Sequence, residues 1–395
     1  MDLHHTVAHG RHRRRRTRLR GAAIGLALAL LTGIAVAVFL WPSGPASPGQ
    51  AEAAPTSAGT GGAGHEGHEG HTSAPSDPAG ASSLGAPAPA SSAASPGAGR
   101  AVPVGRAPHH AAIAPDGRFA YVADPAARAV IRFDTALGAA VGAIPVPEAP
   151  PQLVTFAPDG SRAYVSAYDE GFTVNAVVTI DTRSDTRVGA VPVGRGPYAA
   201  ATTSDGRLLY VPYFDEDHLD VLDTTTGELV DRIEVPPSPH WVAFPPDRRS
   251  AYVTNHFSDV VTVLELGSNR VVTSIPVGDG PHSLEVSPDG TRIALVDYIS
   301  DDVVLIDPAT NTVVGTVPAV GAGPQDVTWA PDGRHLYTAN VDDGTVAVVD
   351  VRAGVVTARI PTGADPTSVS VTPDGRRLLV TNFGDGTVRL LDAAG

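Results

Sequence analysis

The chain has 395 residues, of which 28 are basic and 42 acidic, so its formal net charge is −14 at neutral pH. It contains no cysteine, which excludes disulfides, zinc-thiolate sites, iron–sulfur clusters and haem attachment through a C-x-x-C-H motif. Residues 101–395 carry 20 arginines against 37 carboxylates, a net of −17. Because such a domain repels phosphate backbones, we expect no nucleic-acid partner.

The N-terminus combines a basic segment, residues 1–20, with a charge-free apolar segment, Gly21–Trp41. The apolar segment is long enough to cross a bilayer, and Trp41 stands where an interfacial aromatic belongs. The preceding arginines place the N-terminus in the cytoplasm and the rest of the chain outside. Two interpretations stay open: a retained signal anchor, giving a single-pass protein of the cell membrane, or a signal cleaved near Ala51-Glu52-Ala53, giving a secreted protein.

Residues 42–100 are mostly Ala, Gly, Ser and Pro, and we predict a disordered linker because they offer too little apolar surface to offset chain entropy. The linker contains His65, His68 and His71, whose side chains could capture copper or zinc weakly. The alternative is that these histidines belong to a solvated spacer without a ligand.

From residue 101 onward one pattern recurs seven times: a proline, then Pro-Asp-Gly or a near relative seven residues later, then an alternating apolar run. The anchoring prolines are Pro108, Pro151, Pro197, Pro239, Pro281, Pro324 and Pro366. A period of about 42 to 46 residues, with four short alternating runs in each unit, is typical of a β-propeller. We therefore predict that residues 101–395 form an all-β, seven-bladed β-propeller of four-stranded blades.

The two ends of the repeat region predict how the ring closes. The last unit ends with a third strand at residues 387–392, and residues 101–104 resemble the outer strands of other units. Pairing these two segments completes the seventh blade and leaves no long unpaired edge. We expect a monomer.

The segment Tyr252-Val253-Thr254-Asn255 is the signature tetrapeptide of the YVTN-repeat β-propellers. Variants stand in other units, for example at residues 121–124 and 337–340, whereas Ala294-Leu295-Val296-Asp297 departs from the pattern. The chain resembles this family over residues 101–395. Similar propellers occur in surface-layer and secreted bacterial proteins, in lactonases and a streptogramin lyase, and in nitrous oxide and nitrite reductases. The reductase interpretation lacks the cysteine ligands and the haem-attachment motif.

The resemblance implies that ligands bind around the central channel, on the face where the loops from outer to inner strands lie. The residue after each anchoring proline falls on that channel mouth, and the ends of the second strands add more polar side chains. The predicted ligand-binding residues there are His109, Gln152, Tyr198, His240, His256, His282, Tyr298 and Gln325.

Three of these residues, His240, His256 and His282, are expected to lie close together because adjacent inner strands converge near the axis. Neutral imidazoles in that arrangement could bind zinc or copper, with Asp297 or Tyr298 as an oxygen ligand or supporting partner. The alternative is structural: the histidines hydrogen-bond carbonyls of neighbouring blades and fill the channel mouth.

No complete catalytic set can be identified, and no serine stands in a G-x-S-x-G sequence. We therefore predict a membrane-tethered, extracytoplasmic binding or scaffold propeller that recognises a partner protein or an envelope ligand at its channel mouth. Two alternatives stay open: a lactonase- or lyase-like enzyme acting on small molecules, and an envelope protein that binds copper or zinc.

Overall fold

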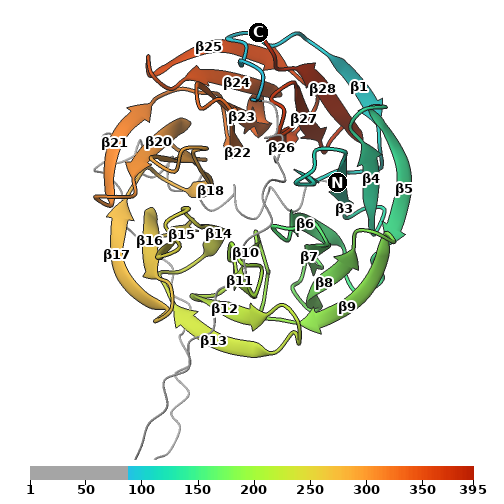
Figure 1. Ribbon diagram of the computed structural model, residues 1–395, viewed down its shortest axis with the longest axis vertical. Coiled ribbons are helices and arrows are strands. Elements are labelled where there is room, and N and C mark those ends of the chain that lie inside the picture. The colour runs from blue at the N-terminus through green and yellow to red at the C-terminus, as the bar shows by residue number, and fades with distance from the viewer. Residues whose placement is uncertain (1–87) are drawn as a thin grey trace, which may run out of the picture. The chain divides into compact units, whose positions relative to one another are not determined.

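A computed structural model describes residues 88–395, which form seven four-stranded antiparallel sheets arranged as a ring (Figure 1). The predicted seven-bladed propeller is therefore confirmed. The basic segment, the apolar segment Gly21–Trp41 and the linker histidines lie outside the described residues. Within residues 88–395, no helix has the length and apolar character needed to cross a membrane.

Each blade has an inner, a second, a third and an outer strand. The inner strands are β2 (His110–Ile113), β6 (Pro151–Phe156), β10 (Ala201–Thr202), β14 (Pro239–Ala243), β18 (Pro281–Val286), β22 (Pro324–Trp329) and β26 (Pro366–Val371). The second strands are β3 (Phe119–Asp124), β7 (Arg162–Tyr168), β11 (Leu208–Pro212), β15 (Ser250–Asn255), β19 (Ile293–Asp297), β23 (His335–Asn340) and β27 (Arg377–Asn382).

The third strands are β4 (Ala129–Asp134), β8 (Asn175–Asp181), β12 (His218–Asp223), β16 (Val260–Glu265), β20 (Asp302–Asp307), β24 (Thr345–Asp350) and β28 (Thr387–Asp392). The outer strands are β5 (Ala139–Pro145), β9 (Thr186–Pro192), β13 (Leu229–Glu234), β17 (Arg270–Pro276), β21 (Thr312–Val317), β25 (Val355–Pro361) and, for the seventh blade, β1 (Arg100–Pro103). One short 3₁₀ turn, η1 (Val341–Asp343), follows β23.

The ring closes by pairing its first strand with its last, as predicted. β1 runs antiparallel to β28, with Val102 opposite Val388 and Pro103 opposite Thr387. The outer edge of the seventh blade is thus supplied by the beginning of the repeat region, and β28 is not left as an unpaired edge.

Residues 88–99 differ from the predicted linker, because they pack on the ring. The amide of Ala90 donates to the carbonyl of Asp374, and the hydroxyl of Ser92 donates to the carboxylate of Asp332 at 2.8 Å. Ser92 also contacts the His335 ring, 2.6 Å from its Nδ1. We call residues 88–99 the strap. The composition of the strap resembles the linker, so only its contacts with the last two blades distinguish it.

Apolar side chains from neighbouring blades pack against one another and form the core. One cluster, for example, joins Tyr121 of the first blade to Val165 and Val178 of the second. The tyrosine that opens the tetrapeptide is fully buried, and its hydroxyl reaches the outer turn of the next blade: Tyr121 donates to Asp185, and Tyr252 to Asn311. The tetrapeptide thus fastens one blade to the next.

Candidate functional site

The residues that follow the anchoring prolines form a layer across the channel mouth, which we call the plug. Six of them are buried and His109 is half-buried. The plug residues are His109, Gln152, Tyr198, His240, His282, Gln325 and Thr367. Sequence analysis placed these residues correctly by repeat position, but their burial means that they close the mouth rather than line an open one.

Three histidines and a tyrosine form the centre of the plug. The ring centroids of His240 and His256 are 4.7 Å apart, those of His240 and His282 4.9 Å, and those of His256 and His282 5.6 Å. Tyr198 packs on His240 at 4.4 Å, and its hydroxyl lies 3.3 Å from Nε2 of His282. Tyr298 borders this group, 6.1 Å from the His282 ring.

Two of the three histidines, His240 and His256, are held by backbone carbonyls. Nδ1 of His256 lies 3.3 Å from the carbonyl of Pro281 in the next blade, and Nδ1 of His240 lies 3.3 Å from the carbonyl of Ser238. Burial, with the two nearby imidazoles, holds the pKa of His240 well below its usual range. His240 is therefore neutral at physiological pH, and the carbonyl contacts favour the tautomer with a proton on Nδ1.

This packing does not produce the predicted zinc or copper site. Among residues 88–395, no group of three or more His, Asp or Glu side chains has an arrangement that could hold a metal ion. The imidazoles pack against one another and against Tyr198 and Phe214, and the Nδ1 contacts of His240 and His256 fix these two rings in that packing. Asp297 is engaged elsewhere, since its carboxylate accepts the amide of Gly278 and lies beside Asp302.

The other predicted mouth residues lie around this group. Gln325 hydrogen-bonds the Tyr198 side chain. His109, on the first blade, contacts the carbonyl of Gln152 through Nδ1 at 3.0 Å, and the Gln152 amide donates to the carbonyl of Tyr168. Each of these contacts joins neighbouring parts of the ring mouth, so the plug is one connected polar and aromatic layer.

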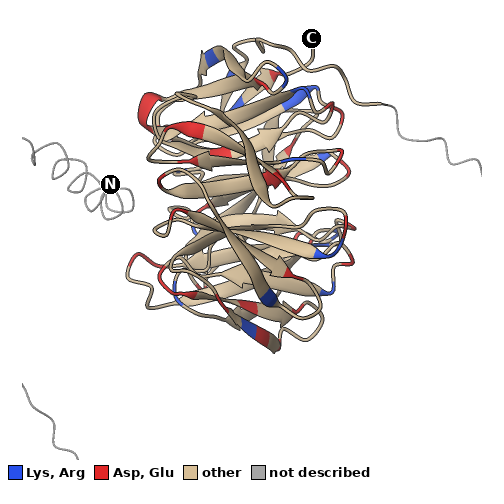
Figure 2. Ribbon diagram, turned by 90° about the vertical axis from the view of Figure 1, so that its left-hand side faces the viewer, with Lys and Arg blue, Asp and Glu red and all other residues tan. Residues whose placement is uncertain are grey.

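Above the plug, the loops of the mouth face are acidic, and we call them the rim. Their acidic residues are Glu148, Asp169, Glu170, Asp215, Glu216, Asp217, Asp259, Asp279, Asp301, Asp342, Asp343, Asp365 and Asp385, against Arg106, Arg128 and Arg195. The loops of the opposite face carry as many arginines as carboxylates. Figure 2 shows this contrast from the side, with red loops along one edge of the ring and blue and red together along the other.

Aromatic side chains accompany the acidic rim. Phe257 is 39% exposed and packs on His256 and Phe214, and Phe172 continues the row beside Phe214. Sequence analysis did not select these phenylalanines. The signal was available, because Phe214, Phe257 and Phe383 all follow shortly after the end of a second strand.

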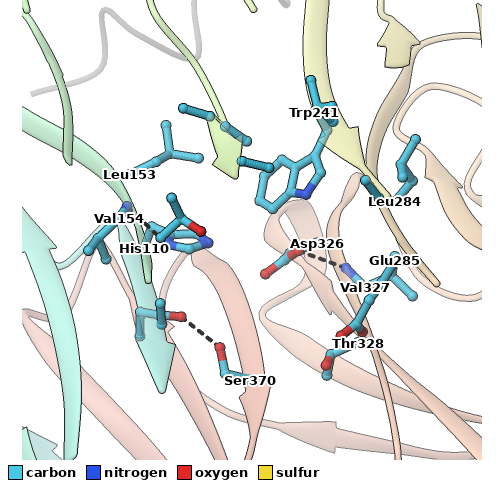
Figure 3. A pocket seen from close by; sticks show the side chains of 18 of the residues that line it. His110, Leu153, Val154, Trp241, Leu284, Glu285, Asp326, Val327, Thr328 and Ser370 are labelled. Atoms are coloured by element: carbon cyan, nitrogen blue, oxygen red, sulfur yellow. Dashed lines mark hydrogen bonds between the residues drawn. The ribbon is translucent and has the colours of Figure 1, made fainter. Parts of the chain in front are cut away.

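Below the plug, the channel widens into a cavity of about 380 Å³ lined by all seven inner strands (Figure 3). None of the plug residues lines it. The indole of Trp241 reaches into the cavity from β14, with His110 and Asp326 across from it (Figure 3). The cavity wall extends to Thr328 and Val371, close to the Pro-Asp-Gly turns, so the cavity lies on the side of the plug away from the rim.

The cavity is lined by ionisable groups that the sequence did not single out as a site: Asp326 is buried, and Glu285 and His110 are half-buried. Burial raises the pKa of both Glu285 and Asp326 to about 7. Burial, with the neighbouring His109, lowers the pKa of His110 to about 3, so this imidazole stays neutral. Nδ1 of His110 is the acceptor for the amide of Val154 at 3.5 Å, which agrees with a neutral ring.

Comparison with known proteins identifies the fold but no single family for the whole chain. A profile of the cytochrome D1 heme domain matches residues 322–395 only. Among solved structures, hydrazine synthase of Kuenenia stuttgartiensis is similar with a TM-score of 0.66 and 22% sequence identity, over 73% of this chain and 96% of that chain. No curated protein matches the chain. These similarities define the class as a seven-bladed β-propeller.

Proposed function

We propose that this chain is a non-enzymatic binding propeller of the YVTN type, whose mouth face recognises a basic segment of a partner protein. The observation that carries the proposal is the acidic rim around a row of aromatic side chains, on only one face of the ring. An aromatic centre with charged surroundings is common in protein interfaces, and charge complementarity accelerates association and selects partners.

The proposal keeps the face predicted from the sequence but changes the residues that meet the partner. Because the plug histidines are buried, the partner contacts Phe257, Phe214 and the rim carboxylates. Several of these carboxylates also accept rim amides, as Asp301 does from Gly323 and Asp385 from Ala364. Their charges are therefore held at fixed positions, which reduces the entropy that binding costs.

The strap suggests how the face is presented. Its contacts with Asp332 and Asp374 lie at the Pro-Asp-Gly turns, on the side opposite the rim. The strap therefore leaves the rim uncovered. If the apolar segment Gly21–Trp41 anchors the chain as we propose, an extracytoplasmic partner can reach the rim.

The matched profile is named for a heme domain, and the residues that line the channel cavity can be compared with what a haem requires. Haem iron needs an axial side chain, and His110 is the histidine of the cavity. Its Nδ1 accepts the Val154 amide, so its other nitrogen carries the proton. Among the described residues lining the cavity there is no arginine to pair with haem carboxylates, while Glu285 and Asp326 would repel them. The residues present do not fit a haem.

Charge neutralisation on the rim tests the proposal. We choose Asp217, Asp279 and Asp365, which are exposed and accept no rim amide. The triple variant Asp217→Asn, Asp279→Asn, Asp365→Asn should weaken binding of a fluorescent decalysine peptide about tenfold, measured by anisotropy at 50 mM salt, because rim charges contribute about 0.2 to 1 kcal/mol each.

The matched control removes three charges from the opposite face, through Asp116→Asn, Glu228→Gln and Asp247→Asn. This control should bind the peptide within twofold of the unaltered protein. If both triple variants weakened peptide binding equally, the net charge of the protein would explain the binding, and the proposed binding face would be contradicted. Absence of measurable peptide binding would contradict it as well.

A further inference from the structure

The inner strands are joined around the channel by a repeated side-chain contact. In several blades the second residue after the anchoring proline accepts an amide from the inner strand of the next blade. Ser283 accepts from Val327 at 2.9 Å, Ser368 from Ala111 at 2.9 Å, and Asp326 from Val369 at 3.0 Å. A serine therefore makes this contact as well as a carboxylate does.

Glu285 stands two positions further along the strand, and its Oε2 accepts the amide of Trp329 at 2.6 Å. The equivalent residues of the other blades are Ala112, Thr155, Ala201, Ala243, Thr328 and Ser370. Joining blades thus requires no carboxyl group at either position. Withdrawing a carboxylate from water is costly, and here Asp326 is buried and Glu285 half-buried, in adjacent blades and facing one cavity. Their presence there needs another explanation.

Trp241 occupies the same repeat position as Asp326, where no other blade has a tryptophan. Its indole lies 5.7 Å from the His110 ring, centroid to centroid, and borders the cavity with Glu285 and Asp326. An indole face attracts organic cations, and the attraction is strongest where water is excluded. Among the described lining residues there is no arginine or lysine to oppose a cation.

We propose that the channel cavity binds a small organic cation, a protonated amine or a quaternary ammonium ion, between Trp241 and the carboxylates of Glu285 and Asp326. The cavity volume of about 380 Å³ is within the range of small-ligand sites. The cation enters from the face of the Pro-Asp-Gly turns, because the plug closes the other end. This site is separate from the rim and does not depend on the rim's function.

The chemistry sets the direction of a pH dependence. The titratable groups that line the cavity are His110 from β2, Tyr164 from β7, Glu285 from β18 and Asp326 from β22. His110 stays neutral above its pKa of about 3, and burial raises the pKa of Tyr164 further above its usual value. Only the two carboxyl groups change charge near pH 7, and a cation binds their ionised forms. Affinity should therefore be several-fold higher at pH 8 than at pH 6.

The test uses tetramethylammonium as the probe and tert-butanol as a neutral molecule of similar shape. Isothermal titration calorimetry of the protein at constant ionic strength should show saturable binding of tetramethylammonium and none of tert-butanol. Glu285→Gln or Asp326→Asn, each of which keeps an oxygen for the neighbour's amide, should weaken binding at least fivefold. The double variant should abolish binding.

Two further variants complete the design. Trp241→Leu, the residue found at this position in the second blade, should also weaken binding at least fivefold, whereas Ser268→Ala, on an exposed turn outside the cavity, should leave it within twofold. If the amide variants misfold, Glu285→Thr with Asp326→Ser replaces them, since Ser and Thr serve these positions in other blades. Equal binding of tert-butanol, unchanged binding in the double variant, or no saturation up to about 100 mM probe would each overturn the proposal.

Discussion

In five blades the second strand ends with an Asn or Asp, which holds the connection from the outer strand into the next inner strand. Asn255 donates to the carbonyl of Pro236, and Asn340 donates to that of Val320. In the first blade the hydrogen bond runs in the opposite direction, because the carboxylate of Asp124 accepts it from the amide of Arg106. In these five blades the last position of the tetrapeptide has a structural role, and either an amide or a carboxylate can fill it because both can hydrogen-bond the connection.

Asp297 makes the same connection in the fifth blade, but it lies directly across from Asp302 in the register. Burial, followed by the charge of Asp302, raises the pKa of Asp297 from 3.8 to about 8. The folded protein therefore holds a proton here that the unfolded chain releases above pH 4. Stability from this pair is complete below about pH 4 and is lost as the pH rises toward 8.

We predict that Asp302→Thr, the residue at this position in the last two blades, raises the melting temperature at pH 8 by several degrees. At pH 4 it should change the melting temperature little, because the Asp297 carboxyl is then protonated in the unaltered protein and does not repel Asp302. Thermal unfolding followed by circular dichroism at the two pH values measures the difference. An equal shift at both values would mean that packing, and not the shared proton, is responsible.

At the scale of elements, neighbouring blades are joined both by apolar packing and by polar contacts between inner strands. The contact from Ser283 to the amide of Val327 lies fully inside the ring. The third blade does this differently: its inner strand β10 has two residues, and the amide of Ala199 donates to the carbonyl of His240. In most blades the pairing of the third strand with the outer strand contains a register shift, as between Val263 and Leu264 where β16 pairs with β17. Such irregularities make the outer edge of a blade a poor template for pairing with another strand.

Ser283→Ala should reduce the free energy of unfolding by about 1 kcal/mol, because the Val327 amide then keeps only the Asp326 carboxylate as a buried acceptor. Urea unfolding measures this change. The exposed Ser268→Ala serves as the control and should stay within about 0.5 kcal/mol of the unaltered protein. A loss in Ser283→Ala no greater than the control's would show that the joint depends on apolar packing alone.

At the scale of the whole molecule, the ring depends on contacts between the two ends of the described chain. β1 supplies the outer strand of the last blade, and the strap continues along the same blade through the Gly97 amide, which donates to the carbonyl of Asp392. The side chain of Arg389, on β28, donates to the carbonyl of Ala98 in the strap. These contacts replace the fourth strand that the last repeat lacks.

We expect a chain that begins at Gly105 to unfold at a markedly lower urea concentration than one that begins at Ala88, and to aggregate, because β28 becomes an exposed edge. A chain that begins at Arg100 keeps β1 and should be intermediate. Urea unfolding and light scattering distinguish the three. Equal stability of the shortest and longest chains would contradict closure by β1.

The repeat made much of this architecture predictable. Each anchoring proline fixes the register of its blade, so the positions of His240 and His282 at the mouth followed from counting. The burial of these two histidines could not be predicted by counting, because it depends on how far side chains such as Tyr198 reach across the ring. Glu285 and Asp326 were missed because each reads as the polar member of an alternating strand. Only the closed ring turns those positions toward a cavity.

The closure of the ring has a consequence for biosynthesis. The strand that seals the last blade leaves the ribosome before every blade, and its partner leaves after all of them. Since contacts so distant in sequence form slowly, an incompletely synthesised chain presents an open end to proteases and chaperones until its final strand arrives. Closure of the ring therefore waits for the synthesis of β28, and a chain terminated before that strand keeps an unsealed edge.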